Sequence, residues 1–91
     1  MLVAKVRQRV RFKTTILDAE IADLIAECKA DLRLSGVLPA RIIDEDPLIL
    51  RAVSTYCRAY YETDGDAAKR LQLSYDLLKQ HLTLSVDYTT P

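Results

Sequence analysis

Residues 46–61 read DPLILRAVSTYCRAYY and predict the most buried helix of the chain. Aspartate suits the cap position before a helix, and proline suits the first helical position because its missing N–H would have no partner there. From Pro47 to about Glu62, apolar residues cover most sides of the predicted helix. This segment is therefore expected to be the central helix of a bundle. A narrow polar stripe, which we interpret as its solvent side, is formed by Arg51, Ser54, Thr55, Arg58 and Glu62.

A long amphipathic helix is predicted upstream of this segment, where Thr14, Thr15 and Asp18 offer oxygen acceptors for the free amides at its start. Ser35-Gly36 ends it, because glycine can take the left-handed conformation that closes a last turn. Residues 37–46 hold a proline and no helical period, so we expect a loop held down by Ile42 and Ile43. The core stripe of the upstream helix, at spacings of three and four, consists of Leu17, Ile21, Leu24, Ile25, Cys28 and Leu32.

A third helix is predicted downstream, over about residues 67–84. Residues 63–66 form a turn in which Asp66 can cap this helix. Its packing seam consists of Ala68, Leu71, Tyr75, Leu78 and Leu82. Residues 86–91 lack any period and are expected to form a flexible tail.

The first 13 residues are the most basic part of the chain. They hold five of the 13 basic residues and no acidic one, a net charge of +5, which leaves a net charge of −5 on the rest. Their alternation of charged and uncharged residues fits a strand, whereas Leu2, Val3, Val6 and Val10 share one helical face. We favour a short amphipathic helix over residues 1–13, because no other strand is predicted with which it could pair. Its basic residues fit a solvated surface, a contact with the acidic face of a neighbouring subunit, or a contact with nucleic acid.

The fold class that follows is all-α, a small bundle of three main helices plus a short N-terminal helix, in a single domain over residues 1–91. Of the residues, 49% are hydrophobic, while 2 are Gly and 3 are Pro, which is unlike the composition of disordered chains. A domain of this size buries only about 60–65% of its unfolded surface, so part of its apolar surface is expected to need a partner. No apolar run is long enough to predict a membrane span or an export signal.

Chemistry-bearing residues are sparse. Cys28 and Cys57 sit among apolar helical positions and are interpreted as reduced core thiols, and the lone His81 as a surface residue. The acidic residues 62–66 lack the glycine and glutamate spacing of an EF-hand, and residues 44–46 are better explained as a loop and a helix cap. We find no nucleophile with a base, no metal-ligand spacing and no phosphate-binding glycine loop. The prediction is a protein that is not an enzyme, with no catalytic, cofactor-binding or metal residues.

Three blocks of the chain resemble the head–tail connector family of tailed bacteriophages. Residues 18–37 (DAEIADLIAECKADLRLSGV) look like the family's first long helix, residues 43–61 (IDEDPLILRAVSTYCRAYY) like its acidic loop and apolar helix, and residues 70–85 (RLQLSYDLLKQHLTLS) like its closing helix. The resemblance implies a structural subunit of a homo-oligomeric ring that docks under the portal protein, extends the DNA channel without reading sequence, and receives a downstream tail-completion protein. It also implies a place in the virion, with assembly in the host cytoplasm.

A head-to-tail contact between subunits suits a chain with two oppositely charged parts. Our hypothesis is that the basic first helix of one subunit lies against the acidic face of the next. The interface residues would be Arg7, Arg9, Arg11, Glu20, Asp23, Glu27 and Asp31. Two rival readings stay open: a small helical DNA-binding regulator, which would need a basic recognition helix, and an antitoxin-like interaction module with a small fixed stoichiometry.

Overall fold

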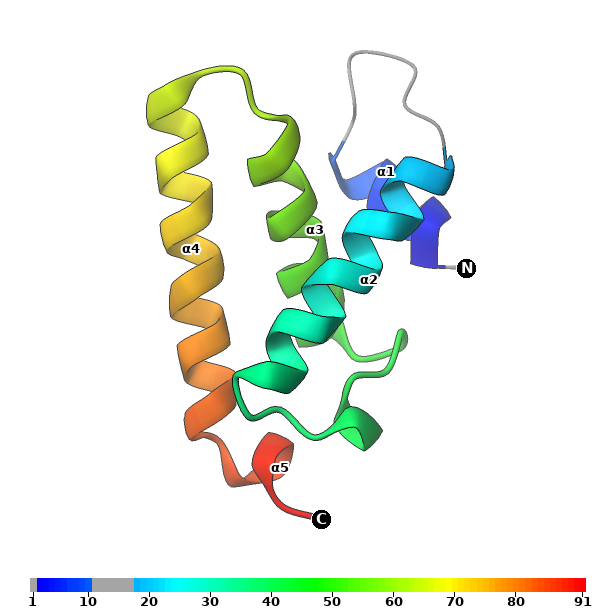
Figure 1. Cartoon of the computed structure of the whole chain (residues 1–91), viewed down its shortest axis with the longest axis vertical. Helices are drawn as coiled ribbons and strands as arrows, with labels where there is room; N and C mark the ends of the chain where they lie inside the picture. Colours follow the sequence, from blue (N-terminus) through cyan, green and yellow to red (C-terminus); the bar gives the residue numbers. More distant parts are fainter. Residues whose placement is uncertain (1, 11–17) are drawn as a thin grey trace.

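A computed structural model describes residues 2–10, with side chains up to residue 8, and residues 18–91 (Figure 1). Within these residues the chain forms helices, turns and loops and no strand, which confirms the all-α prediction. The elements are α1 (Leu2–Val10), α2 (Asp18–Leu34), the 3-10 helix η1 (Pro39–Arg41), α3 (Pro47–Tyr61), α4 (Gly65–Leu84) and α5 (Val86–Thr89).

Helix α3 is the centre of the bundle, as predicted. It packs against α4 on one side and against α1 and α2 on the other (Figure 1). Its start follows the prediction too, because the Asp46 carboxylate accepts a hydrogen bond from the Leu48 N–H at 2.8 Å and Pro47 is the first helical residue. The side chains of α3 that are fully buried include Ile49, Val53 and Cys57.

The predicted solvent side of α3 is wrong at two positions. Ser54 is buried and Thr55 is half-buried, whereas Arg51, Arg58 and Glu62 are exposed. Three neighbouring helices surround α3, so only a narrow strip of it reaches water. The Ser54 hydroxyl has no hydrogen-bond partner among the described residues.

Helix α2 follows its prediction closely. Ile21, Leu24, Ile25, Cys28 and Leu32 are all buried, while Leu17 lies outside the described residues. The helix ends at Leu34 and is closed by the turn at Gly36, whose φ of 117° is in the left-handed region.

The closing hydrogen bonds of α2 belong to a Schellman motif. The Val37 N–H donates to the Leu32 carbonyl at 3.0 Å and the Gly36 N–H to the Arg33 carbonyl at 3.1 Å. The motif turns the chain so that Val37 enters the core.

The connection over residues 37–46 contains η1 and is only partly anchored as predicted. Ile42 packs on the core, but Ile43 is exposed, so its predicted anchoring role is wrong. Val37 takes the buried place instead, because the end of α2 directs it inward. An ion pair of 2.8 Å between Lys29 Nζ and Asp44 also ties this loop to α2.

Helix α4 begins earlier than predicted, at Gly65. Its cap is Asp64, whose carboxylate accepts from the Asp66 N–H at 3.3 Å, so the prediction that Asp66 caps the helix is wrong. Asp66 lies in the first turn, where a negative charge still favours the helix dipole. The packing seam is confirmed, with Tyr75 and Leu82 buried and Ala68, Leu71 and Leu78 half-buried.

Residues 86–89 form the short helix α5, so the expectation of a tail without regular structure is wrong for them. The Leu38 N–H donates to the Tyr88 carbonyl at 2.9 Å, and the Tyr88 hydroxyl donates to the Asp46 carboxylate at 2.7 Å. These contacts fasten α5 to the loop before α3. They reach across the sequence, and for that reason local periodicity did not reveal them.

Helix α1 confirms the helical reading of the N-terminal segment and makes the strand reading wrong. Leu2 and Val6 are buried, and Val3 packs beside them. The helix lies against α3 and α2. Residues 11–13 of the predicted helix lie outside the described residues.

Candidate functional site

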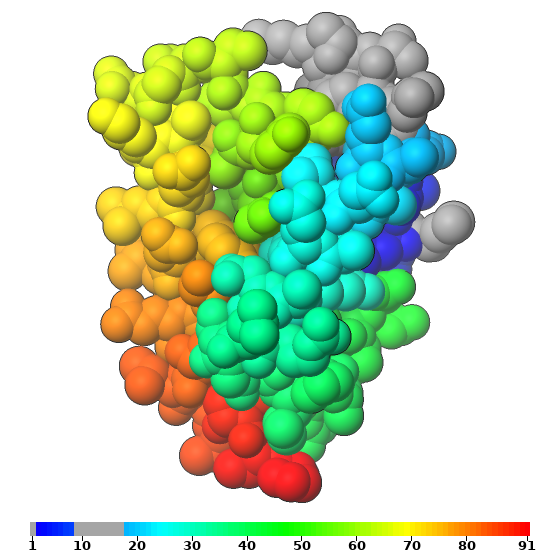
Figure 2. Space-filling model, viewed as in Figure 1, coloured from blue at the N-terminus to red at the C-terminus, as the bar shows by residue number. Residues whose placement is uncertain are grey.

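A groove of about 440 Å³ opens between α2, α3 and α4. Figure 2 shows this face, with α2 crossing it diagonally, α4 at its left margin and atoms of α3 between them. The residues that line the groove are Asp31, Tyr56, Ala59, Tyr60, Gln72, Tyr75, Asp76 and Lys79.

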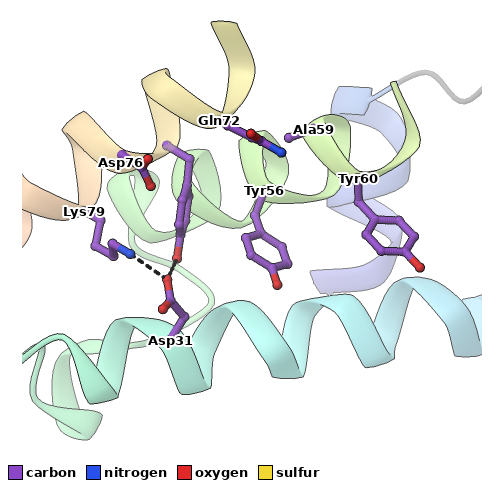
Figure 3. Close-up of a pocket in the computed structure, with 8 residues that line it drawn as sticks. Asp31, Tyr56, Ala59, Tyr60, Gln72, Asp76 and Lys79 are labelled. Carbon is purple, nitrogen blue, oxygen red and sulfur yellow. Dashed lines mark hydrogen bonds and ion pairs between the residues drawn. The ribbon is translucent and has the colours of Figure 1, made fainter. Parts of the chain in front are cut away.

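Asp31 is the polar centre of the groove (Figure 3). Its carboxylate accepts hydrogen bonds from the Tyr75 hydroxyl at 2.7 Å and from Lys79 Nζ at 3.0 Å. The Cys28 thiol in turn donates to the Tyr75 oxygen at 3.6 Å. The network therefore ties α2 to α4, two helices that share the face shown in Figure 2.

Protonation in this network is fixed by burial and by the partners of each group. Burial by itself raises the pKa of Asp31, but the hydrogen bonds from Tyr75 and Lys79 outweigh it and the pKa is lowered. Burial and the hydrogen bond to Asp31 raise the pKa of Tyr75 far above its usual value. Asp31 is thus ionised and Tyr75 protonated near neutral pH. Both groups are satisfied by each other, and neither is poised as a general acid or base.

Three tyrosines give the groove an aromatic floor. The rings of Tyr56 and Tyr75 meet edge to face, with centroids 5.2 Å apart. The Tyr56 hydroxyl donates to Glu27 at 3.5 Å, while Tyr60 remains mostly exposed. In Figure 3, Tyr56 and Tyr60 both extend from α3 toward α2. An open groove with aromatic walls and few free polar groups suits a protein contact better than a small polar ligand.

The basic residues of the interface hypothesis are placed only in part. Arg7 of α1 binds Asp18 of the same chain, with Nη2 at 2.8 Å and Nε at 3.1 Å from one carboxylate oxygen. The side chains of Arg9 and Arg11 lie outside what the structure describes. One of the three arginines is therefore held within its own subunit.

The acidic residues of the hypothesis lie along α2 but do not act alike. Asp31 is used by Tyr75 and Lys79, Glu27 accepts from Tyr56, and Glu20 lies near Tyr61, whose pKa is raised by burial and by that carboxylate. Asp23 is exposed and makes no side-chain hydrogen bond or ion pair with the other described residues. Arg7 binds Asp18, which is not in the acidic set, and the contact between subunits stays a prediction.

Sequence reasoning missed a second surface, on the outer side of α4. Leu73, Leu77 and Leu84 are all exposed there, although the same helix buries Tyr75 and Leu82 on its inner side. The signal was present in the sequence, because the spacings of four and seven put these leucines on one helical face. Only the apolar stripe that packs in the core was identified from the sequence, and the second stripe of leucines was missed.

The remaining candidate residues carry no active centre. Cys28 and Cys57 are free and buried, as predicted, and His81 is exposed on α4. Among the described residues, no three His, Cys, Asp or Glu side chains gather as metal ligands would. Over the same part of the chain, no helix combines the length and apolar character that crossing a bilayer requires.

The described residues form a small all-α protein with an open groove and exposed leucines on its surface. The sequence profile of the phage connector protein family matches residues 2–89, almost the whole chain. The chain therefore belongs to the phage connector protein family. Such a family is one of structural proteins, so membership implies a virion component. No curated protein and no solved structure shows significant similarity to this chain.

Proposed function

We propose that this protein is a structural subunit of a phage head–tail connector, which forms a homo-oligomeric ring under the portal protein and extends the DNA channel. The observation that carries the proposal is the family match over residues 2–89. The structure supports a role in protein assembly, since its surfaces include an aromatic groove, an acidic face on α2 and exposed leucines on α4, which suit contacts with other proteins. In this role the protein assembles in the host cytoplasm, passes DNA without reading its sequence, and receives a tail-completion protein.

Native mass spectrometry of the protein with and without the portal protein of its own phage tests the ring. We expect a single assembly on the portal with many copies of the chain, and ring-shaped particles in electron micrographs of the same sample. A chain that binds the portal in one or two copies, or not at all, would contradict the proposal. The protein alone is the control, because connector subunits need a template if their mutual contacts are weak.

For the contact between subunits, the proposal keeps the charge hypothesis made from the sequence. The basic N-terminal segment of one subunit lies against the acidic face of α2 in the next, with Arg7, Arg9 and Arg11 opposite Glu20, Asp23, Glu27 and Asp31. Its support is the segregation of charge along the chain. Arg7 and Asp31 are poor test positions, since each already has a partner in its own chain.

The sharper test reverses the charges of Arg9, Arg11 and Asp23. Arg9→Glu with Arg11→Glu should weaken ring formation on the portal, and adding Asp23→Lys on the same chain should restore it. Asp76→Lys, an exposed reversal on α4, is the matched control in place of Asp23→Lys. Ring formation unchanged by the arginine variants at low salt would remove the charge hypothesis and leave the ring proposal standing.

The DNA-binding alternative finds no support in the described helices. The exposed face of α4 carries leucines between its basic residues, whereas a recognition helix needs Arg, Lys, Asn or Gln on that face. A salt-sensitive shift of duplex DNA by the purified protein would revive it. The antitoxin-like alternative predicts a small fixed complex on its partner, which the same mass measurement distinguishes from a ring.

A further inference from the structure

Helix α4 carries a second, outward-facing seam with the spacing of a heptad repeat. Leu73 and Tyr75 are separated by about 200° at about 100° per residue, so the outer seam lies opposite the core seam. The outer leucines are 59%, 57% and 78% exposed at positions 73, 77 and 84. The seam, at alternating spacings of four and three, consists of Asp66, Arg70, Leu73, Leu77, Gln80 and Leu84.

No described element covers this seam. Helix α4 packs against α3 and α5, and its other side forms the edge of the molecule (Figure 1). Single exposed leucines are ordinary on protein surfaces. A run of them at alternating spacings of three and four is instead the pattern by which two helices pack side by side.

The charges along α4 select the direction of such a pairing. Lys69 and Arg70 lie near its amino end, and both are exposed without an ion pair in the described part of the chain. In a parallel pair, these cations would face their own copies. In an antiparallel pair, they would lie near the partner's helix carboxyl end, which carries partial negative charge and, just beyond it, the exposed Asp87.

We propose that two copies of this chain associate through the outer seams of α4, packed antiparallel about a two-fold axis. Setting Leu73 opposite Leu84 of the second copy also sets Leu77 opposite Gln80. The Leu73–Leu84 pair and the Leu77–Gln80 pair then each occur twice, once on either side of the axis, as an interface between identical faces requires.

This dimer is a property of the free protein and does not depend on the proposed ring. A single helix pair buries less than the roughly 800 Å² per partner of a standard interface, so the association is expected to be weak. It covers the apolar face of α4 in free subunits. Portal-bound assembly and free dimerisation are measured separately, so failure of one leaves the other intact.

Disulfide trapping tests the arrangement directly. Leu73→Cys and Leu84→Cys chains are mixed and oxidised at about pH 8, where exposed thiols react as thiolates. Burial raises the pKa of Cys28 to about 11 and that of Cys57 to about 12, so the natural cysteines stay protonated and hidden. The mixture should give the cross-linked heterodimer. Neither variant alone should cross-link, because positions 73 and 84 are about 16 Å apart along a helix and a disulfide spans much less.

The matched control replaces Leu73→Cys by Ser74→Cys, an exposed position on the flank of the seam. Its mixture with Leu84→Cys should cross-link at least tenfold less. Equal cross-linking of the control mixture, self-cross-linking of the Leu73→Cys chain, or no cross-link in the main mixture would each overturn the antiparallel dimer.

Sedimentation velocity up to about 1 mM protein gives the second readout, since weak dimers populate only at such concentrations. The unmodified protein should dimerise, Leu77→Lys should weaken dimerisation at least tenfold, and Ser74→Lys should leave it unchanged. An unmodified protein that stays monomeric at the highest concentration overturns the proposal, and so does a Leu77→Lys variant that dimerises normally. Circular dichroism of each variant establishes that the helices are intact.

Discussion

Ser54 and Tyr75 show two opposite fates of a hydroxyl in this small core. The Tyr75 hydroxyl donates to Asp31 and accepts from Cys28, so burial leaves it with two partners. The Ser54 hydroxyl is buried in α3 with none among the described residues. A buried polar group without a partner costs about 1–3 kcal/mol relative to water, so Ser54 weakens the helix around which the bundle is built.

Replacing Ser54 by alanine is expected to stabilise the protein. Ser54→Ala should raise the free energy of unfolding by about 1 kcal/mol beyond the few tenths that the higher helix propensity of alanine supplies. Ser74→Ala, at an exposed position of α4, measures that propensity effect alone. Urea denaturation gives both values. A Ser54→Ala variant no more stable than Ser74→Ala would mean that the hydroxyl has found a partner.

A half-buried tyrosine, Tyr88, makes stability sensitive to alkaline pH. Burial and the hydrogen bond to Asp46 raise the pKa of Tyr88 to about 12. The unfolded chain loses this proton at about pH 10, so the stability contributed by Tyr88 is complete below about pH 10 and is lost as the pH rises toward 12. The free energy of unfolding should therefore fall with pH in this range.

Tyr88→Phe isolates this effect. In urea titrations at several pH values above 9, the variant should lose stability less steeply than the unmodified protein, although its stability at neutral pH is lower. Tyr60→Phe, on an exposed ring, should keep the original slope. Parallel slopes for all three proteins would contradict the assignment.

At the scale of elements, Asp46 accepts two hydrogen bonds, one within α3 and one from α5. One carboxylate oxygen caps α3 through the Leu48 N–H, and the other accepts from Tyr88 of α5. Asp64, by contrast, only caps α4. The two caps form a matched pair in which one is also a tertiary anchor.

Asp46→Ala should therefore cost more than Asp64→Ala. Loss of a cap costs about 1 kcal/mol, whereas Asp46→Ala also leaves the Tyr88 hydroxyl without its acceptor, so we expect about 2–3 kcal/mol in total. Asp46→Asn keeps an oxygen acceptor, so its loss in the free energy of unfolding should lie between those of Asp46→Ala and Asp64→Ala. Thermal and urea unfolding give the comparison, and equal losses for the two alanine variants would show that the Tyr88 contact adds nothing.

The elements that sequence reasoning recovered are those with strong local signals. Periodic apolar residues and caps predicted α2, α3 and α4, and glycine marked the end of α2. Helix α5 is too short to show a period, and its anchors lie 42 or more residues away at Asp46 and Leu38. Ser54 was misplaced because an almost wholly apolar helix does not reveal which side its neighbours leave open.

The surfaces were harder to predict than the helices. The Asp31–Tyr75 contact joins residues 44 positions apart, and no spacing within one helix predicts it. Arg7 binds Asp18 of its own chain, a pairing that the sequence pattern did not indicate, and its contact with another subunit stays a prediction. The leucine seam of α4 was readable from spacing alone, yet its exposure depends on α4 lying at the edge of the bundle.

At the scale of the whole molecule, charge and apolar surface together favour association. The chain has no formal net charge near neutral pH, so copies do not repel each other at long range. The exposed leucines of α4 remain in water only while the molecule is alone. Association that binds the native state alone stabilises that state by mass action.

The midpoint of thermal unfolding should therefore rise with protein concentration. For Leu77→Lys, the midpoint should stay constant over the same range, and Ser74→Lys should behave like the unmodified protein. Differential scanning fluorimetry or calorimetry at concentrations spanning at least a hundredfold gives this comparison. Concentration-independent midpoints for all three proteins would show that the native monomer gains nothing from its neighbours.

The double use of Asp46 also bears on how the native protein opens. If α5 detaches, the hydrogen bond from the Tyr88 hydroxyl to Asp46 breaks, and the Asp46 carboxylate that protects the Leu48 amide can rotate into solvent. The hydrogen bond from the Leu38 amide to the Tyr88 carbonyl breaks in the same event. The two amides should then exchange their hydrogens with solvent at similar rates, as members of one cooperative fluctuation. The first turn of α3 would then be no more stable against local opening than the contacts that α5 makes with Asp46 and Leu38.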